Sequence, residues 1–180
     1  MTDHVRFFIS EIREPLLKRR VAEMEPIFAD MFTELTGVVL TVVDARSSWH
    51  VASYDWRHRR IELNCEFFAH DTYNTLPFVL AHEMVHAVQW ITRRIPYGER
   101  AADVFALSRL PVGLYPRRKA FYVKVPNGLL LKKSHLVKQT AERSIMMRSQ
   151  GTRCYISWFE SELKLLNRNL LRETRELDFE

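Results

Sequence analysis

The sequence contains little cysteine, and its two cysteines stand far apart. Cys65 and Cys154 are the whole complement in 180 residues, and no Cys-x-x-Cys pair occurs. A disulfide scaffold or a zinc knuckle built from thiolates is therefore not expected, and a single disulfide between the two is a minor alternative. A reducing compartment fits this cysteine usage, so we expect a cytoplasmic protein.

Long apolar runs are also missing. No stretch approaches the roughly 18–20 apolar residues that a membrane span needs, and no apolar signal region follows Met1. The sequence therefore predicts neither a transmembrane segment nor a secretory leader. With 47% hydrophobic residues and five glycines, and without repeats or low-complexity segments, the chain is predicted to be a folded globular protein.

Acidic residues are nearly absent from the segment 111–153. This segment contains ten basic residues and one acidic residue, Glu142, so its net charge is +9. The rest of the chain has 17 basic and 21 acidic residues and a net charge of −4, which gives +5 for the whole chain. Such a segment suits an anionic partner, either nucleic acid, a lipid surface or an acidic protein. A solvated surface arm is the plainer interpretation, and we prefer it. The basic residues are Arg117, Arg118, Lys119, Lys124, Lys132, Lys133, Lys138, Arg143, Arg148 and Arg153.

The periodicity of apolar residues predicts an α+β fold. Residues 1–37 show helical spacing, with an interruption at Pro15 and a restart near Pro26. Three β-rich segments follow and predict a short, about three-stranded sheet. The predicted strands are 38–45, 49–56 and 59–65.

Helices dominate the rest of the prediction. Long helical patterns cover 73–94 and 99–110, a short hairpin is expected around Pro126-Asn127-Gly128, and a further helix over 134–149. An amphipathic helix is expected in 154–180. Its apolar face can pack on the same domain or on a second copy, so the oligomeric state stays unknown. We divide the chain into N-terminal helices, a core, a basic segment and this last helix, all within one compact domain. The boundaries are 1–37, 38–110, 111–153 and 154–180.

The residues with the clearest chemistry are His82, Glu83 and His86, in the sequence "LPFVLAHEMVHAVQW". They form His-Glu-x-x-His on a predicted helix, where histidines four apart share a face and can bind one ion. Glu83 lies beside that ion and can take a proton from a water molecule. Met84 and Val85 can turn into the core. The alternative is that the histidines are ordinary hydrogen-bonded residues and Glu83 a solvated charge.

A third ligand is available a short distance downstream. Catalytic zinc usually takes three protein ligands and keeps one position open. Glu99 follows a break at Pro96 and Gly98 that lets the chain double back. Asp103, four residues later on the same helical face, can accept a hydrogen bond from a ligand histidine.

These motifs resemble a known group of enzymes. "LAHEMVHA" followed by "ERAADVFALSRLP" is similar to the gluzincin metallopeptidases, and within them to the minigluzincins and the ImmA/IrrE group. The resemblance covers roughly residues 38–111. It implies a zincin-like core, Zn²⁺ bound by His82, His86 and Glu99, Glu83 as general base, and Asp103 supporting a ligand. The step from His86 to Glu99 is short for several gluzincin families.

The resulting expectation is a zinc-dependent endopeptidase acting on a peptide or protein substrate. Substrate would add as a strand along the edge strand before the active helix, expected at 59–65. Candidate donors to the reacting oxygen are Tyr97, Tyr115, Tyr122 and His135.

Three alternatives remain open from the sequence. One is a DNA-associated protease that resembles the SprT group, with His135 as third ligand and the basic segment on nucleic acid. Another, which the resemblance to minigluzincins suggests, is a latent enzyme in which the basic segment covers the cleft and Cys154 or an acidic tail residue fills the open metal position. The third is a catalytically silent, zinc-stabilised regulatory or binding module.

Overall fold

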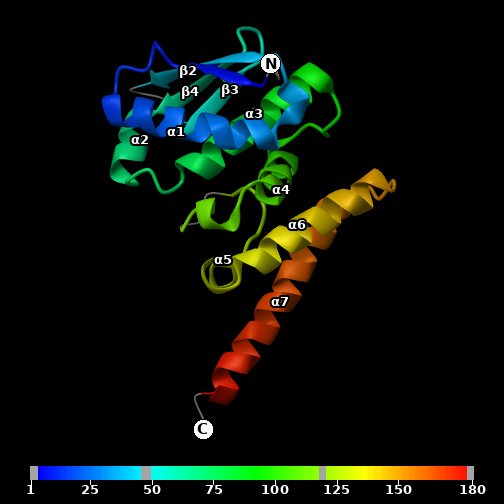
Figure 1. Cartoon of the computed structure of the whole chain (residues 1–180). Coiled ribbons are helices and arrows are strands. Elements are labelled where there is room, and N and C mark those ends of the chain that lie inside the picture. Colours follow the sequence, from blue (N-terminus) through cyan, green and yellow to red (C-terminus); the bar gives the residue numbers. More distant parts are fainter. Residues whose placement is uncertain (1–3, 46–49, 118–120, 178–180) are drawn as a thin grey trace. The chain divides into compact units, whose positions relative to one another are not determined.

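A computed structural model of the chain describes residues 4–45, 50–117 and 121–177. The parts of the predicted segments at 1–3, 46–49, 118–120 and 178–180 lie outside these residues. The chain divides into two compact units, one ending at Tyr97 and one beginning at Gly98. The first combines a sheet with helices and the second is helical, which confirms the α+β class (Figure 1). The finer domain boundaries stay a prediction.

The sheet of the first unit has four strands within the described residues, in the order β1-β2-β4-β3. β1 runs parallel to β2, β2 runs parallel to β4, and β3 pairs antiparallel with β4. The strands are β1 (Arg6–Phe8), β2 (Val39–Ala45), β3 (Ala52–Asp55) and β4 (Arg60–Asn64). The three predicted strands are thus present, and β1 is an addition.

The prediction that 1–37 is helical was wrong at its start, where β1 lies. Val5 and Phe7 are buried while Arg6 and Phe8 are exposed, which is the two-residue period of a strand. Arg6 pairs with Val39 across the sheet. Because this partner lies more than thirty residues away, local spacing did not reveal it.

One face of the sheet is buried and the other is not. Leu40, Val42, Ile61 and Leu63 are fully buried, whereas Val39, on the opposite face, is 52% exposed. Helices α1 (Pro15–Met31) and α3 (Leu76–Thr92) lie on the same side of the sheet (Figure 1). The core of this unit therefore lies between that sheet face and the two helices.

Helix α1 continues through Pro26, so the expected restart there was wrong. The helix begins at Pro15, where proline loses no intrahelical hydrogen bond, and Glu14 caps it. The Glu14 carboxylate accepts hydrogen bonds from the backbone N–H groups of Leu16 and Leu17. It also accepts one from the Tyr73 hydroxyl at 2.9 Å, which ties α1 to the segment before α3.

A short connection leads from β4 to α3. Helix α2 (Cys65–His70) is capped by the Asn64 side chain, and Asp71 then accepts hydrogen bonds from both the backbone N–H and the hydroxyl of Thr75. Thr72 and Tyr73, between them, have positive φ angles. The start of α3 is therefore held by several specific contacts.

The second unit contains α4 (Glu99–Arg109), α5 (Asn127–Lys132), α6 (Ser134–Ser149) and α7 (Tyr155–Leu177). A short 3₁₀ turn, η2 (Val112–Leu114), follows α4, as η1 (Thr33–Leu35) follows α1 in the first unit. The predicted helices of this half are confirmed. The hairpin expected at Pro126-Asn127-Gly128 was wrong, because Asn127 begins α5 and its Leu129 and Leu130 are buried.

Side chains from α6 and α7 hold α4 in place. The Lys138 ammonium donates to the carbonyl oxygens of Ser108 and Leu110, and so satisfies acceptors at the end of α4. Arg100 and Glu160 form an ion pair at 2.8 Å. In the described part of the chain, no helix has both the length and the apolar character required to cross a membrane.

Candidate metal centre

Helix α3 is buried on almost every side. All but four of its 17 residues are buried, and the four exceptions are His86, Trp90, Ile91 and Thr92. His82 and Glu83 are each only 6% exposed, and Met84 and Val85 are fully buried as expected. Ionisable side chains in such a helix need specific partners, because burying them unpaired is costly.

The two histidines of the motif face one another. The Nε2 atoms of His82 and His86 lie 3.1 Å apart, one turn of α3 from each other. Both nitrogens therefore converge on one point beside the helix, as the four-residue spacing predicts.

Gln89, which the sequence analysis missed, orients the second histidine. Its Oε1 lies 2.7 Å from His86 Nδ1, and its Nε2 donates to the Pro96 carbonyl at 2.6 Å. Gln89 is fully buried. Glutamine is a common helix residue, so its type and position three residues after His86 gave no signal in the sequence.

Glu99 completes the candidate ligand set. The ligand atoms of His82, His86 and Glu99 all lie within 4.8 Å of one another. This is the group of metal-ligating side chains that the described residues form, and neither His135 nor Cys154 belongs to it. Two imidazole nitrogens and one carboxylate oxygen are a donor set that suits a divalent transition metal. The three residues therefore fit the ion that the motif implies.

The backbone before Glu99 has an unusual conformation. Helix α3 ends at Thr92, the capping residue Arg93 is left-handed with φ 57°, and Ile95 is buried. Gly98 has φ 118° and ψ 152°, a region open essentially to glycine alone. The turn that delivers Glu99 to the first position of α4 therefore depends on this glycine.

Asp103 lies on α4 and is fully buried. Its carboxylate accepts hydrogen bonds from the backbone N–H groups of Tyr122 and Val123, and so holds the segment after 120 to α4. The predicted contact between Asp103 and a ligand histidine stays a prediction.

The candidate donors to the reacting carbonyl oxygen differ in how exposed their side chains are. Tyr115 is buried and its hydroxyl donates to the Leu107 carbonyl; burial raises the pKa of this phenol. Its hydroxyl is therefore already engaged inside the second unit. Tyr97 and Tyr122 are 54% and 62% exposed, and His135 is exposed as well.

The expected substrate edge was wrong. β4, the strand of the segment 59–65, lies between β2 and β3 and has no free edge. β3 is the outer strand on this side of the described sheet, and α3 contacts it. Sequence spacing did not show that the strand predicted at 49–56 would pair with the edge of β4.

An aromatic ladder, formed by Trp56, Trp90 and Tyr97, lies beside this strand. Trp56 and Trp90 stack with ring centroids 5.1 Å apart and an interplanar angle of 13°, and Tyr97 packs edge-on against Trp90. Arg57 lies over the Trp56 ring at 5.3 Å. The ladder joins the end of β3, the end of α3 and the segment before Glu99.

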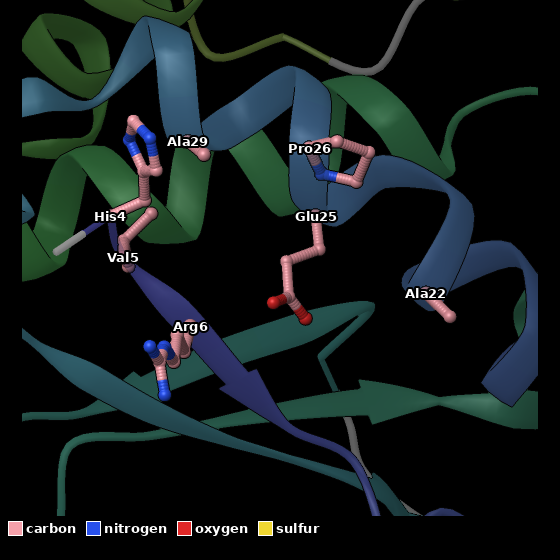
Figure 2. A pocket seen from close by; sticks show the side chains of 7 residues that line it. All are labelled: His4, Val5, Arg6, Ala22, Glu25, Pro26 and Ala29. Atoms are coloured by element: carbon pink, nitrogen blue, oxygen red, sulfur yellow. The ribbon is translucent and has the colours of Figure 1, made fainter. Parts of the chain in front are cut away.

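A groove of about 470 Å³ lies elsewhere in the first unit (Figure 2). It is lined by residues of α1 and of the chain around β1, and the Glu25 carboxylate points from α1 toward the strand that carries Arg6. None of its lining residues comes from α3, so it is separate from the candidate metal centre. The lining residues are His4, Val5, Arg6, Ala22, Glu25, Pro26 and Ala29.

The basic segment is mostly solvent-facing where it is described. Six of its basic residues are exposed and Lys133 is half-buried, whereas Lys138 binds the end of α4. Arg118 and Lys119 lie outside the described residues. This pattern agrees with the preferred interpretation of a solvated surface, and an anionic partner stays a prediction. The exposed residues are Arg117, Lys124, Lys132, Arg143, Arg148 and Arg153.

Comparison with known proteins identifies no relative. No family model, curated protein or solved structure matches the chain. The resemblance to gluzincins therefore rests on the motif residues alone, and the candidate function rests on the chemistry of the site.

Proposed function

We propose that the protein is a zinc-dependent endopeptidase with its active site on α3. The observation that carries the proposal is the meeting of His82, His86 and Glu99 ligand atoms within 4.8 Å. A set of three protein ligands leaves a coordination position open for water, as is typical of catalytic rather than structural zinc.

The protein residues have separate roles in this proposal. His82, His86 and Glu99 would hold Zn²⁺, which polarises a peptide carbonyl and lowers the pKa of water. Glu83, next to His82 on the buried helix, accepts a proton from the attacking water and passes it to the leaving amine as the carbon–nitrogen bond breaks. Of the candidate donors to the carbonyl oxygen, Tyr97, Tyr122 and His135 remain in the proposal.

The substrate is proposed to bind along β3 as an added strand. Val51 accepts a hydrogen bond from the Asn64 N–H, and hydrogen-bonded pairs alternate along an antiparallel ladder. Ser53 and Asp55 therefore also bond to β4, and the backbone groups of Ala52 and Tyr54 face outward. An extended peptide can pair with them, which favours unfolded segments as substrates.

Two further functions are weaker candidates. A protease resembling the SprT group would use His135 as third ligand, but Glu99 is the residue whose oxygen meets the two histidines. A silent regulatory module would need no general base, whereas Glu83 is present beside His82. Two free cysteines support a reducing, cytoplasmic location, which we propose as well.

The Glu83→Gln variant tests the proposal. Glutamine keeps the shape of the side chain but cannot accept the proton, so cleavage of a quenched-fluorescent unfolded protein should fall by at least about 100-fold. Binding of one zinc equivalent, measured by atomic absorption after dialysis, should persist. The matched control is Glu66→Gln on α2, an exposed carboxylate, which should cleave like the wild type.

Two results would contradict the proposal. Full cleavage by the Glu83→Gln variant would remove Glu83 from the mechanism. A wild-type protein that holds one zinc and cleaves no unfolded protein would favour the silent module instead.

A further inference from the structure

The Gln89 side chain does more than pack in the core around α3, because its amide makes two specific contacts. It is fully buried, and its side-chain amide bridges His86 and the backbone of Pro96. Both contacts are short, at 2.7 and 2.6 Å. Both partners flank the candidate metal centre, since Glu99 follows Pro96 by three residues.

The bridge determines which nitrogen of His86 carries the proton. The Pro96 carbonyl can only accept, so the Gln89 amide must direct its NH₂ group there and its oxygen toward His86. The reversed amide would place two acceptors 2.6 Å apart. An amide oxygen beside His86 Nδ1 requires that nitrogen to donate. In the neutral ring, Nε2 then carries the lone pair, and it is Nε2 that faces His82.

We propose that Gln89 is a positioning residue that holds His86 in the Nδ1–H form and so presents Nε2 to a metal ion. The same amide ties Pro96 to α3, just before the turn through Gly98 to Glu99. The inference rests on the proposed metal centre, but the tautomer of His86 is a property of the metal-free chain. The two can therefore fail separately.

Two variants of Gln89 separate its two contacts. Gln89→Glu keeps an acceptor for His86 Nδ1–H and loses the donor to Pro96. Gln89→Met removes both contacts at similar side-chain length. Zinc affinity, measured by competition with a chromogenic chelator, should fall about 10- to 100-fold in Gln89→Met. It should stay within a few-fold of wild type in Gln89→Glu, although that variant should unfold at lower urea.

The decisive readout is the His86 ring itself. Nitrogen-15 NMR of the metal-free protein should show Nδ1 protonated in the wild type and in Gln89→Glu, and a mixture of tautomers in Gln89→Met. A merely structural glutamine would not move this signal. Thr92→Ala is the matched control, since it removes a hydrogen bond at the same end of α3, to the Val88 carbonyl, without touching His86.

The inference is overturned if Gln89→Met keeps the Nδ1–H form of His86 and wild-type zinc affinity. If Gln89→Met does not fold, Gln89→Asn, which is one methylene too short for the bridge, takes its place with the same expected results. A wild-type protein that shows the Nδ1–H tautomer but binds no zinc would overturn the proposed function and leave the tautomer assignment standing.

Discussion

Gly98 shows how much one residue contributes to the candidate site. Its φ of 118° would strain any other residue, although among the described residues, its two chain neighbours aside, no atom lies within 4 Å of where a side chain would start. The backbone conformation alone therefore requires glycine here. The residue directly precedes Glu99, so the turn and the proposed third ligand are linked.

We predict that Gly98→Ala destabilises the protein by about 1–3 kcal/mol, the cost of holding a non-glycine residue in this region. Urea unfolding measures the loss. Gly113→Ala is the matched control, because Gly113 has no positive φ and also has open space around it. It should be neutral or stabilise by about 0.4–1 kcal/mol. Equal effects of the two substitutions would argue against strain at Gly98.

At this scale the sequence predicted the candidate ligands that meet in the structure, but not the side chains that hold them. His82, His86 and Glu99 were identifiable because metal-binding residue types at helical spacing carry a chemical meaning. Gln89 was not, because its role depends on the position of the Pro96 carbonyl, which no local pattern encodes. The support that Asp103 was expected to give a ligand histidine stays a prediction, and its contacts with the Tyr122 and Val123 backbone depend on a segment nearly twenty residues away.

Among the elements, α3 depends on contacts at its beginning. Burial raises the pKa of the Glu14 carboxyl, but the hydrogen bonds from Leu17, Tyr73 and Leu16 lower it by more. The resulting pKa lies below the ordinary value for glutamate. Burial, followed by the hydrogen bond to Glu14, raises the pKa of Tyr73 to about 12. The ionised Glu14 thus connects the start of α1 to the segment that leads into α3.

We predict that Glu14→Gln costs about 1 kcal/mol at neutral pH, as for other helix N-caps. Since the folded-state pKa of Glu14 is lowered, the unfolded chain binds the extra proton first as the pH falls. The contribution is therefore present above the ordinary pKa of 4.5 and is lost as the pH falls from there through the lower folded-state pKa. Urea unfolding of wild type and variant from pH 7 to 3 should show the gap closing.

The control for this prediction is Glu11→Gln, an exposed carboxylate close by in sequence, which should cost little at any of these pH values. A gap between wild type and Glu14→Gln that stays constant down to pH 3 would mean that the charge of Glu14 has no part in the cap.

Elements with a strong internal period were predicted well, and those defined by distant partners were not. α3, α6 and α7 were found from their apolar spacing, and β2, β3 and β4 from their β-branched or alternating residues. β1 needed β2 as a partner, and the order of β3 and β4 in the sheet was not encoded locally. At α5, Asn127 and Gly128 favoured a hairpin, but Gly128 instead lies against α7, where a side chain at this position would press on Asn167.

For the molecule as a whole, metal binding and folding should be coupled. A ligand that binds only the folded state stabilises it by about 2.7 kcal/mol at 100 times its dissociation constant. Zinc should therefore raise the melting temperature, measured by scanning calorimetry, in a concentration-dependent way. His86→Ala should abolish the shift, and Glu99→Ala should reduce it.

His135→Ala is the matched control, since His135 is exposed and lies outside the ligand group. It should keep the full zinc-dependent shift. If His135→Ala lost the zinc-dependent rise in melting temperature and Glu99→Ala kept it, His135 would replace Glu99 as the proposed third ligand. That result would favour the alternative that resembles the SprT group.

The stacked indoles of Trp56 and Trp90 give the molecule an internal optical reporter. Two of the four tryptophans lie face to face, so their electronic transitions couple and should produce a paired circular dichroism band in the ultraviolet. One indole belongs to the helix that carries the histidines and the other follows the strand proposed to receive substrate. Changes in spacing between these two parts of the site can thus be followed without an added dye.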